Sequence, residues 1–176
     1  MRIIAGEAKG RRIAAPRSGT RPFTGRAREA VFSSLARHIP GAFVLDLFAG
    51  SGSLGLEALS RGAERVVFVE GDRSAVGVLA SNVEAVGLGG RIVRSDVESF
   101  LAHDRDVYDL IFVDPPFAMG DPDVDRIVDL VGDRLSSAGI VVIHRRAGGS
   151  APKSDNLQGT GPRRYGDSEI WILEKE

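Results

Sequence analysis

The chain has 176 residues, 43% of them hydrophobic and 27% charged, so it is long enough for a domain with a hydrophobic core. It contains no cysteine, which excludes disulfides and thiolate metal sites, and its three histidines are scattered, so we expect no metal centre. No apolar run approaches the ~20 residues of a membrane span. No apolar segment typical of a secretory signal opens the chain. We therefore expect a cytoplasmic protein with no membrane partner.

The formal net charge of −1 is unevenly distributed along the chain. Residues 1–28 contain eight Lys or Arg and one acidic residue, a net charge of +7, which leaves −8 for residues 29–176. A basic arm on an acidic body predicts contact with a polyanion, and a solvated leader is the alternative. The candidate contacts are Arg2, Lys9, Arg11, Arg12, Arg26 and Arg28.

The N-terminal segment reads as an appendage of the main domain. We expect two short strands within residues 2–15, forming a small hairpin, because isoleucines punctuate this basic stretch. A turn-rich connector follows over residues 16–25. Thr24 is the expected N-cap of a helix over residues 26–37. We accordingly divide the chain into a basic N-terminal hairpin, residues 1–25, and a main domain, residues 26–176.

From residue 42 onward the hydrophobic pattern alternates between strand and helix. Strands are predicted at 42–47, 65–69, 91–94, 108–113 and 139–143, and helices at 53–61, 73–86, 97–102 and 123–135. Such alternation is typical of a parallel sheet with helices on both faces. Residues 146–161 are expected to form a loop, and residues 163–165 and 169–174 an antiparallel hairpin at the sheet edge. The predicted fold class is therefore α/β, Rossmann-like, with a mostly parallel sheet.

The segment Asp114-Pro115-Pro116-Phe117 follows the predicted strand 108–113 and is the most informative stretch of the chain. Prolines have a fixed φ and no N–H, so their carbonyls are free to accept hydrogen bonds from a ligand. Asp114 adds a carboxylate acceptor, and Phe117 adds a flat surface on which a base can stack. This combination favours a planar group that carries an exocyclic amine. The alternative is that the prolines end the strand and Phe117 belongs to the core.

A second motif, Gly50-Ser51-Gly52-Ser53-Leu54-Gly55, matches G-x-G-x-x-G between a predicted strand and a predicted helix. Glycines at these positions allow a tight turn and a close approach of the backbone to a ligand. The motif fits either S-adenosylmethionine (SAM) or a dinucleotide. Alone, it does not distinguish the two cofactors.

Acidic residues at the ends of the first three predicted strands favour SAM. Asp46 can help to hold a methionine ammonium group and would repel a pyrophosphate, whereas Glu70 can bind ribose hydroxyls of either cofactor. Asp96 can accept from an adenine amino group, with the Val97 N–H donating to the ring, or it can cap the following helix. The expected cofactor-binding set is Asp46, Phe48, Gly50, Ser51, Gly52, Glu70, Asp96 and Val97.

Taken together, these motifs resemble the RsmD family of bacterial 16S ribosomal RNA guanine-N2 methyltransferases. The resemblance covers almost the whole chain, and its most specific part is the N-terminal region. Its segments are Arg2 to Gly6, Lys9 to Arg12, Arg21 to Phe32, Asp46 to Ala63, Asp114 to Phe117, and Tyr165 to Ser168. Two positions depart from the family pattern: Phe23 stands where Thr is common, and His144-Arg145-Arg146 stands where an acid is frequent.

The resemblance implies a SAM-dependent enzyme that methylates one guanine of 16S rRNA in the small ribosomal subunit or its assembly intermediate. The basic residues of the arm would contact RNA, the segment Asp114 to Phe117 would hold the target amine, and the protein would act as a monomer. Methylation of a DNA or protein amine, an NAD-binding oxidoreductase and a non-catalytic ribosome-assembly factor are the competing interpretations. The three histidines are expected to be non-catalytic, and Arg145 and Arg146 could meet phosphate or equally lie in a solvated loop.

Overall fold

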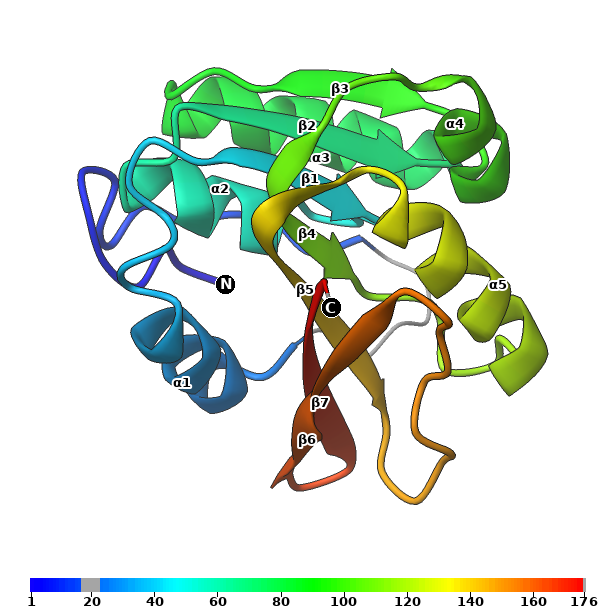
Figure 1. Ribbon diagram of the computed structural model, residues 1–176. Coiled ribbons are helices and arrows are strands. Elements are labelled where there is room, and N and C mark those ends of the chain that lie inside the picture. Colours follow the sequence, from blue (N-terminus) through cyan, green and yellow to red (C-terminus); the bar gives the residue numbers. More distant parts are fainter. Residues whose placement is uncertain (17–22, 176) are drawn as a thin grey trace.

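The computed structural model describes residues 1–16 and 23–175. Within these, five helices and seven strands follow one another in the alternating order that the sequence predicts (Figure 1). The helices are α1 (Gly25–Ser34), α2 (Ser53–Ser60), α3 (Arg73–Val86), α4 (Val97–His103) and α5 (Asp121–Gly132). The strands are β1 (Phe43–Leu47), β2 (Arg65–Glu70), β3 (Arg91–Arg94), β4 (Tyr108–Val113), β5 (Leu135–Arg146), β6 (Leu157–Tyr165) and β7 (Ser168–Lys175).

The strands form one sheet in the order β3-β2-β1-β4-β5-β7-β6. The first five in this order pair in parallel, whereas β7 pairs antiparallel with both β5 and β6. The order reverses between β1 and β4, and in open parallel sheets ligands bind at such a reversal, beyond the carboxyl ends of the strands. Leu47 of β1 lies opposite Val113 of β4, so the glycine motif and the Asp114 segment begin beside each other.

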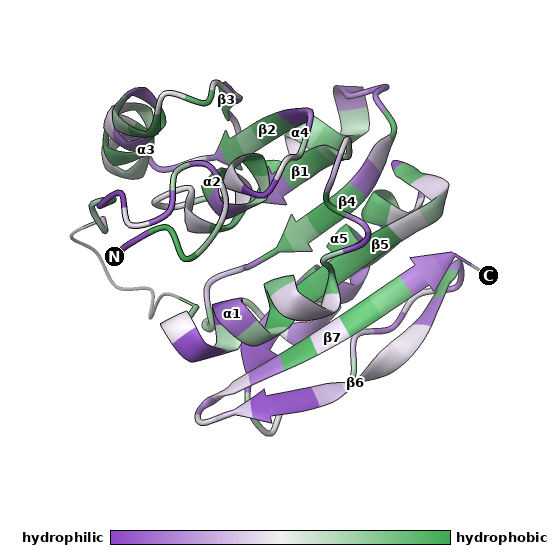
Figure 2. Cartoon of the chain, turned by 90° about the vertical axis from the view of Figure 1, so that its left-hand side faces the viewer, coloured by the Kyte–Doolittle hydropathy of each residue, from purple (hydrophilic) through white to green (hydrophobic). Residues whose placement is uncertain are grey.

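Helices cover both faces of the sheet, with a hydrophobic core on each. The N-terminal arm, α1, α2 and α3 pack against one face, and α4 and α5 pack against the other. Figure 2 shows the central strands β4 and β5 as mainly hydrophobic, whereas the edge strand β6 is mainly hydrophilic. Burial on both faces accounts for the nearly continuous apolar run of β4 in the sequence.

The predicted main-domain elements are confirmed, with shifts of a few residues at several ends. Thr24 caps α1 by accepting a hydrogen bond from the Ala27 N–H at 3.3 Å. The helix that it starts ends at Ser34, earlier than expected. Residues 146–161 are not all loop, because β5 continues to Arg146 along β7, and β6 begins at Leu157 on the other side of β7.

The N-terminal arm differs from the expected pair of strands. Its two sides pair around one bridge, between Arg2 and Arg12, with backbone hydrogen bonds from Ile3 N–H to the Arg11 carbonyl and from Ile13 N–H to the Met1 carbonyl, both 3.0 Å long, but neither side forms a regular strand. The arm is also attached to α2, because the buried Glu57 carboxylate accepts from the backbone N–H groups of Ile4 (2.7 Å) and Ala5 (3.0 Å). Most of the predicted connector, including the basic residues Arg17 and Arg21, falls on residues 17–22, which lie outside the described residues.

Candidate functional site

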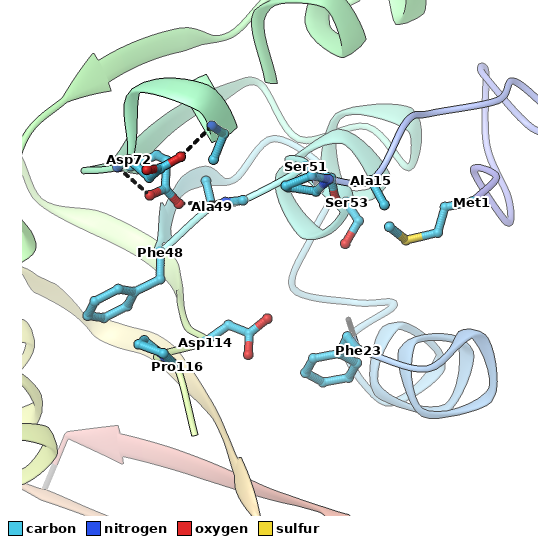
Figure 3. A pocket seen from close by; sticks show the side chains of 14 residues that line it. Met1, Ala15, Phe23, Phe48, Ala49, Ser51, Ser53, Asp72, Asp114 and Pro116 are labelled. Carbon is cyan, nitrogen blue, oxygen red and sulfur yellow. Dashed lines mark hydrogen bonds between the residues drawn. The ribbon is translucent and has the colours of Figure 1, made fainter. Parts of the chain in front are cut away.

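A cavity of about 300 Å³ lies at the carboxyl edge of the parallel strands (Figure 3). It is bordered by the loops that follow β1, β2 and β4, by the start of α2, and by the arm and the segment that precedes α1. The lining residues are Met1, Ala15, Pro16, Phe23, Phe48, Ala49, Gly50, Ser51, Ser53, Glu70, Asp72, Ala75, Asp114 and Pro116. The cavity therefore joins the predicted cofactor loop to the predicted amine-binding segment.

The loop after β1 turns through left-handed backbone conformations into α2. Gly50 and Gly52 have φ values of 54° and 77°, and Phe48, which carries a side chain, has φ 59°. A non-glycine residue in this region is uncommon and is often found at functional sites. A Cβ on Gly52 would lie 2.5 Å from Leu79 Cδ1 and one on Gly55 would lie 2.3 Å from Phe68, so both glycines are also required by packing. The loop exposes its backbone to the cavity.

Glu70, at the end of β2, joins two loops on the rim of this cavity. Its carboxylate accepts from Gly50 N–H at 2.9 Å and from Asp72 N–H at 2.8 Å. Ionised carboxylates offer about four acceptor directions, so the remaining ones are available to hydroxyl groups of a ligand. This arrangement could hold the ribose of either cofactor that the sequence allows.

Asp46 is almost fully buried beneath the loop that follows β1. Its carboxylate accepts from Gly55 N–H at 2.9 Å, which fixes the first turn of α2. Burial raises the pKa of Asp46 well above its ordinary value, and the neighbouring carboxylates of Asp114 and Glu70 raise it further, while the hydrogen bond from Gly55 opposes the shift. The carboxylates of Asp114 and Glu70 thus both act on Asp46, and they make this part of the site acidic, which suits a cationic ligand.

Asp96 and Val97 lie beyond this group of residues, after β3. Asp96 caps α4 by accepting from Ser99 N–H at 3.0 Å, so the structural alternative for this residue is confirmed. Val97, the first residue of α4, is buried in the core. Neither residue borders the cavity. Their position is nevertheless close to the end of β2, because the N–H of the preceding residue, Ser95, donates to the Glu70 carbonyl at 3.2 Å.

The Asp114 segment stands beside the glycine loop, as the strand order requires. Asp114 and Pro116 border the cavity, and Pro115 is buried behind them. The Pro116 carbonyl accepts from Met119 N–H at 2.9 Å, whereas no hydrogen bond among the described residues uses the Pro115 carbonyl. The Pro115 carbonyl and the Asp114 oxygen Oδ2 therefore have no hydrogen-bond partner among the described residues.

His144 is a polar residue of this site that the sequence interpretation set aside. It follows Ile143, which lies opposite Val113 in the β4–β5 pairing, so His144 is adjacent to Asp114. Its Nδ1 lies 2.6 Å from Asp114 Oδ1. The sequence contained a signal for this contact, because Asp114 and His144 lie at the carboxyl ends of two predicted strands. Their adjacency, however, depends on the register in which β4 pairs with β5.

The neighbouring Arg145 is neither free to contact phosphate nor part of a solvated loop. Its guanidinium is largely buried and donates to the Met119 carbonyl at 2.9 Å and to Asp121 at 3.0 Å. The hydrogen bond from Arg145 lowers the pKa of Asp121. Arg145 thus braces the loop that follows Pro116, while Arg146 remains exposed.

The six candidate RNA contacts of the N-terminal region fall into two groups. Lys9, Arg12 and Arg26 are exposed, and Arg2 is exposed while donating to the Gly10 carbonyl at 2.8 Å. The guanidinium groups of Arg11 and Arg28, in contrast, bond to backbone carbonyls outside their own segment of the chain.

Arg11 is exposed, but its guanidinium donates to the carbonyls of Ala85 (3.3 Å) and Val86 at the end of α3. Arg28 requires a correction, because it is only 3% exposed and donates to the Arg2 carbonyl at 2.6 Å. Burial lowers the pKa of the Arg28 guanidinium. Its position inside the fold explains why it cannot serve as a surface contact: it anchors the arm to α1.

The fold and the place of the cavity define a class of protein, the Rossmann-like methyltransferases. A solved structure from Escherichia coli, described as a methyltransferase candidate, covers 100% of this chain and 98% of its own, with a TM-score of 0.89 and 34% identity. A hypothetical protein from Thermus thermophilus covers 99% of both chains, with a TM-score of 0.88 and 33% identity.

Sequence comparison identifies the family within that class. The family described as Conserved hypothetical protein 95 matches residues 1–174, so the chain belongs to this family, the RsmD family that its motifs resemble. Ribosomal RNA small subunit methyltransferase D of Escherichia coli K12 is 46% identical over 122 residues, 68% of this chain. The match spans 62% of that relative, less than two thirds of its length. The YlbH protein of Bacillus subtilis, described as an rRNA methyltransferase candidate, is 41% identical over 123 residues, covering 66% of this chain and 67% of that protein.

Proposed function

We propose that this protein transfers a methyl group from SAM to the exocyclic N2 amine of a guanine in 16S rRNA of the small ribosomal subunit. One observation carries the proposal: Asp114 borders the same cavity as the glycine loop and Glu70, beside the unused Pro115 carbonyl. An amine-binding pair of acceptors therefore adjoins a cofactor loop. The similarity to ribosomal RNA small subunit methyltransferase D supports rRNA as the substrate.

The residues of the cavity suit the two polar ends of SAM. The carboxylates near Asp46 would attract its ammonium and sulfonium charges, and Glu70 would accept hydrogen bonds from its ribose hydroxyls. Phe48 and the glycine loop would form the wall along the cofactor. Asp96 and Val97 would lie toward the adenine end. A pyrophosphate would meet repulsion from the same carboxylates, which argues against NAD as the ligand.

Asp114 and the Pro115 carbonyl would accept the two N–H groups of the target amine. The lone pair of a guanine amine is delocalised into the ring, and these hydrogen bonds would favour a more tetrahedral and more nucleophilic nitrogen. When bound, SAM supplies the activated methyl group. On transfer of that methyl group to the amine, the C–S electron pair would remain on sulfur, and the extra proton of the amine would pass to Asp114 or water. Positioning of this kind can supply up to about 7–11 kcal/mol of the barrier reduction.

A guanine in a duplex must be flipped out to reach the cavity, whereas an unpaired guanine need not be. Aromatic surfaces at the site favour such a base, since stacking on them is worth about 1–3 kcal/mol. The candidate surface is Phe117, which is half-buried and lies 5.2 Å from the His144 ring; Phe23 also borders the cavity but is only 3% exposed. A single-stranded or loop region of the RNA is therefore the form of substrate that we expect.

The test is mass mapping of methylated guanines in 16S rRNA from cells with and without the protein. Purified protein with radiolabelled SAM should methylate small-subunit particles from the deletion strain at one guanine, and Asp114→Ala should lose most turnover while binding SAM normally. Transfer to DNA or to a protein amine, with rRNA inert, would favour the competing amine methylases. Particle binding without transfer would favour a non-catalytic assembly factor.

A further inference from the structure

Neighbouring strands hold His144 against the carboxylate proposed to bind the target amine. Val113 and Ile143 are paired in the β4–β5 register, so the next residue of each strand, Asp114 and His144, emerges on the same face of the sheet. The 2.6 Å contact joins His144 Nδ1 to Asp114 Oδ1. The histidine is 1% exposed, whereas 26% of the Asp114 side chain is exposed. One partner is therefore fixed in the core and the other reaches the cavity.

The surroundings of the ring determine which nitrogen carries the proton. An ionised Asp114 only accepts hydrogen bonds, so Nδ1 is the donor. The other nitrogen, Nε2, is buried and has no hydrogen-bond partner in the part of the chain that the structure describes. A proton there would be a buried donor without an acceptor, which is unfavourable. The geometry is thus that of a neutral ring with its proton on Nδ1, and Nε2 offers no route for passing a proton onward.

Two aromatic rings pack against the histidine. The Phe23 ring lies 4.5 Å from the His144 ring centroid at an interplanar angle of 51°, and the Phe117 ring lies 5.2 Å away at 65°. Phe23 itself is only 3% exposed. A ring packed in this way has little freedom to rotate, so the direction of its Nδ1–H bond is fixed by the fold.

We infer that His144 is a positioning residue, which holds Asp114 Oδ1 so that the second carboxylate oxygen faces the target amine. No hydrogen bond among the described residues uses Asp114 Oδ2, and Asp114 borders the cavity. Without the histidine, the carboxylate would sample other rotamers and lose the geometry that transfer requires. The inference rests on the proposed role of Asp114 and adds to it the residue that orients the carboxylate.

The sharpest test compares His144→Leu with His144→Asn. The two replacements have nearly the same branched shape, but asparagine keeps an N–H donor near the place of Nδ1. We expect the leucine variant to lower kcat for methylation of small-subunit particles by about 10- to 100-fold, the range for displaced catalytic groups. SAM affinity and KM should change little, and the asparagine variant should recover most of kcat.

Thermal unfolding of each variant reports whether it folds. If the leucine variant does not, asparagine is compared with His144→Gln, whose longer amide reaches toward Nε2 instead, and only asparagine should be active. Equal turnover in the compared pair, or wild-type turnover in the leucine variant, would overturn the inference. Asp114→Ala distinguishes failure of the positioning role from failure of the proposed function. If Asp114→Ala is inactive while His144→Leu is fully active, only the positioning role of His144 is rejected. If Asp114→Ala is itself active, the proposed role of Asp114 fails with it.

Discussion

Asn82 of α3 donates a hydrogen bond to the carbonyl of Ser51, in the glycine loop, at 2.8 Å. The same amide nitrogen donates to the Ala14 carbonyl at 2.9 Å, and its oxygen accepts from Ala14 N–H at 2.8 Å. One buried side chain therefore ties the N-terminal arm to the loop that borders the cavity. The arm is part of the architecture of the site as well as a basic surface.

Replacing Asn82 by leucine should loosen both segments at once. Leucine has a similar size but leaves the Ser51 carbonyl unsatisfied in the interior and removes both bonds to Ala14. We expect a loss of about 2–3 kcal/mol in the free energy of unfolding, measured by urea denaturation, together with weaker SAM binding. Ser81→Ala, at an exposed position of the same helix, should change stability by no more than about 0.5 kcal/mol. Similar values for the two variants would contradict the role of Asn82.

Glu57 makes a separate prediction about the attachment of the arm. Its carboxylate accepts from Ile4, from Ala5 and from Arg61 Nε, the last at 2.7 Å. In Glu57→Gln one of these donors would face an amide N–H instead of an oxygen. The arm should open more often, and trypsin should cleave after the exposed Lys9 or Arg12 about tenfold faster, as a loss of about 1.4 kcal/mol implies.

The matched control for Glu57 is Glu64→Gln, whose side chain is 68% exposed. It should leave the rate of cleavage in the arm at the wild-type level. Equal protease sensitivity of the wild type and Glu57→Gln would show that Glu57 does not hold the arm.

Asp46 predicts a trade between stability and ligand binding. Its pKa is raised in the folded protein, and the ordinary value is 3.8. As the pH rises above that value, the unfolded chain loses a proton that the folded protein keeps up to its own higher pKa. Asp46 therefore lowers the free energy of unfolding as the pH rises from 3.8 to the pKa of the folded protein. Asp46→Asn, whose amide oxygen can still accept from Gly55 N–H, should be more stable than the wild type at neutral pH.

The difference in unfolding free energy between the wild type and Asp46→Asn should shrink as the pH falls toward 3.8 and vanish below it. Chemical denaturation at several pH values measures this difference, with Asp129→Asn at an exposed position of α5 as the control. The Asp46 variant should also bind SAM more weakly. A stability advantage that grows as the pH falls would have the wrong sign for a raised pKa.

Glu70 tests the identity of the cofactor. The carboxylate spans the loops at Gly50 and Asp72, and a charged hydrogen bond to a ligand is worth about 1.5–3 kcal/mol. Glu70→Gln should accordingly weaken SAM binding by about 10- to 100-fold in calorimetry, whereas Glu64→Gln should not. NAD should give no binding heat with any of the three proteins. Heat from NAD with SAM silent would reject the proposed cofactor.

The order of strands and helices was predictable because each element has a local hydrophobic period and its own turn or cap residues. The β4 strand and the α3 helix have the predicted bounds, since a continuous apolar run and a pair of caps define them. The placing of Asp114 beside the glycine loop was also predictable, because both motifs follow parallel strands. These features depend on short stretches of sequence and on general rules of topology.

The misplaced or overlooked residues share a dependence on contacts between distant segments. His144 meets Asp114 only through the β4–β5 register, 30 residues apart in the chain. Arg28 is buried because the arm folds back over α1, which charge alone would not indicate. The two sides of the arm pair around a single bridge, and residues between them bond to Glu57 and Ser60 of α2. Such partners come from the tertiary fold, so local patterns do not reveal them.

The exposed basic residues of the arm make the last prediction, which concerns the RNA. Arg12 and Lys9 are exposed, and the described residues give neither side chain a hydrogen bond or ion pair, so both are free to meet phosphate. Arg11 is a poorer test because its guanidinium also caps the end of α3. Phosphate contacts position a nucleic acid while the pocket reads the base. Reversal to Arg12→Glu should therefore weaken binding to small-subunit particles without changing SAM affinity. The deficit should shrink as salt rises, with the slope of log affinity against log salt smaller by about 1.

Arg105→Glu is the matched control, since Arg105 precedes β4 at the opposite edge of the sheet from the cavity and is exposed. Methyl transfer and particle binding, measured over a range of salt concentrations for the three proteins, decide the matter. If Arg12→Glu and Arg105→Glu give the same affinities and the same salt slopes, the arm does not contact the RNA.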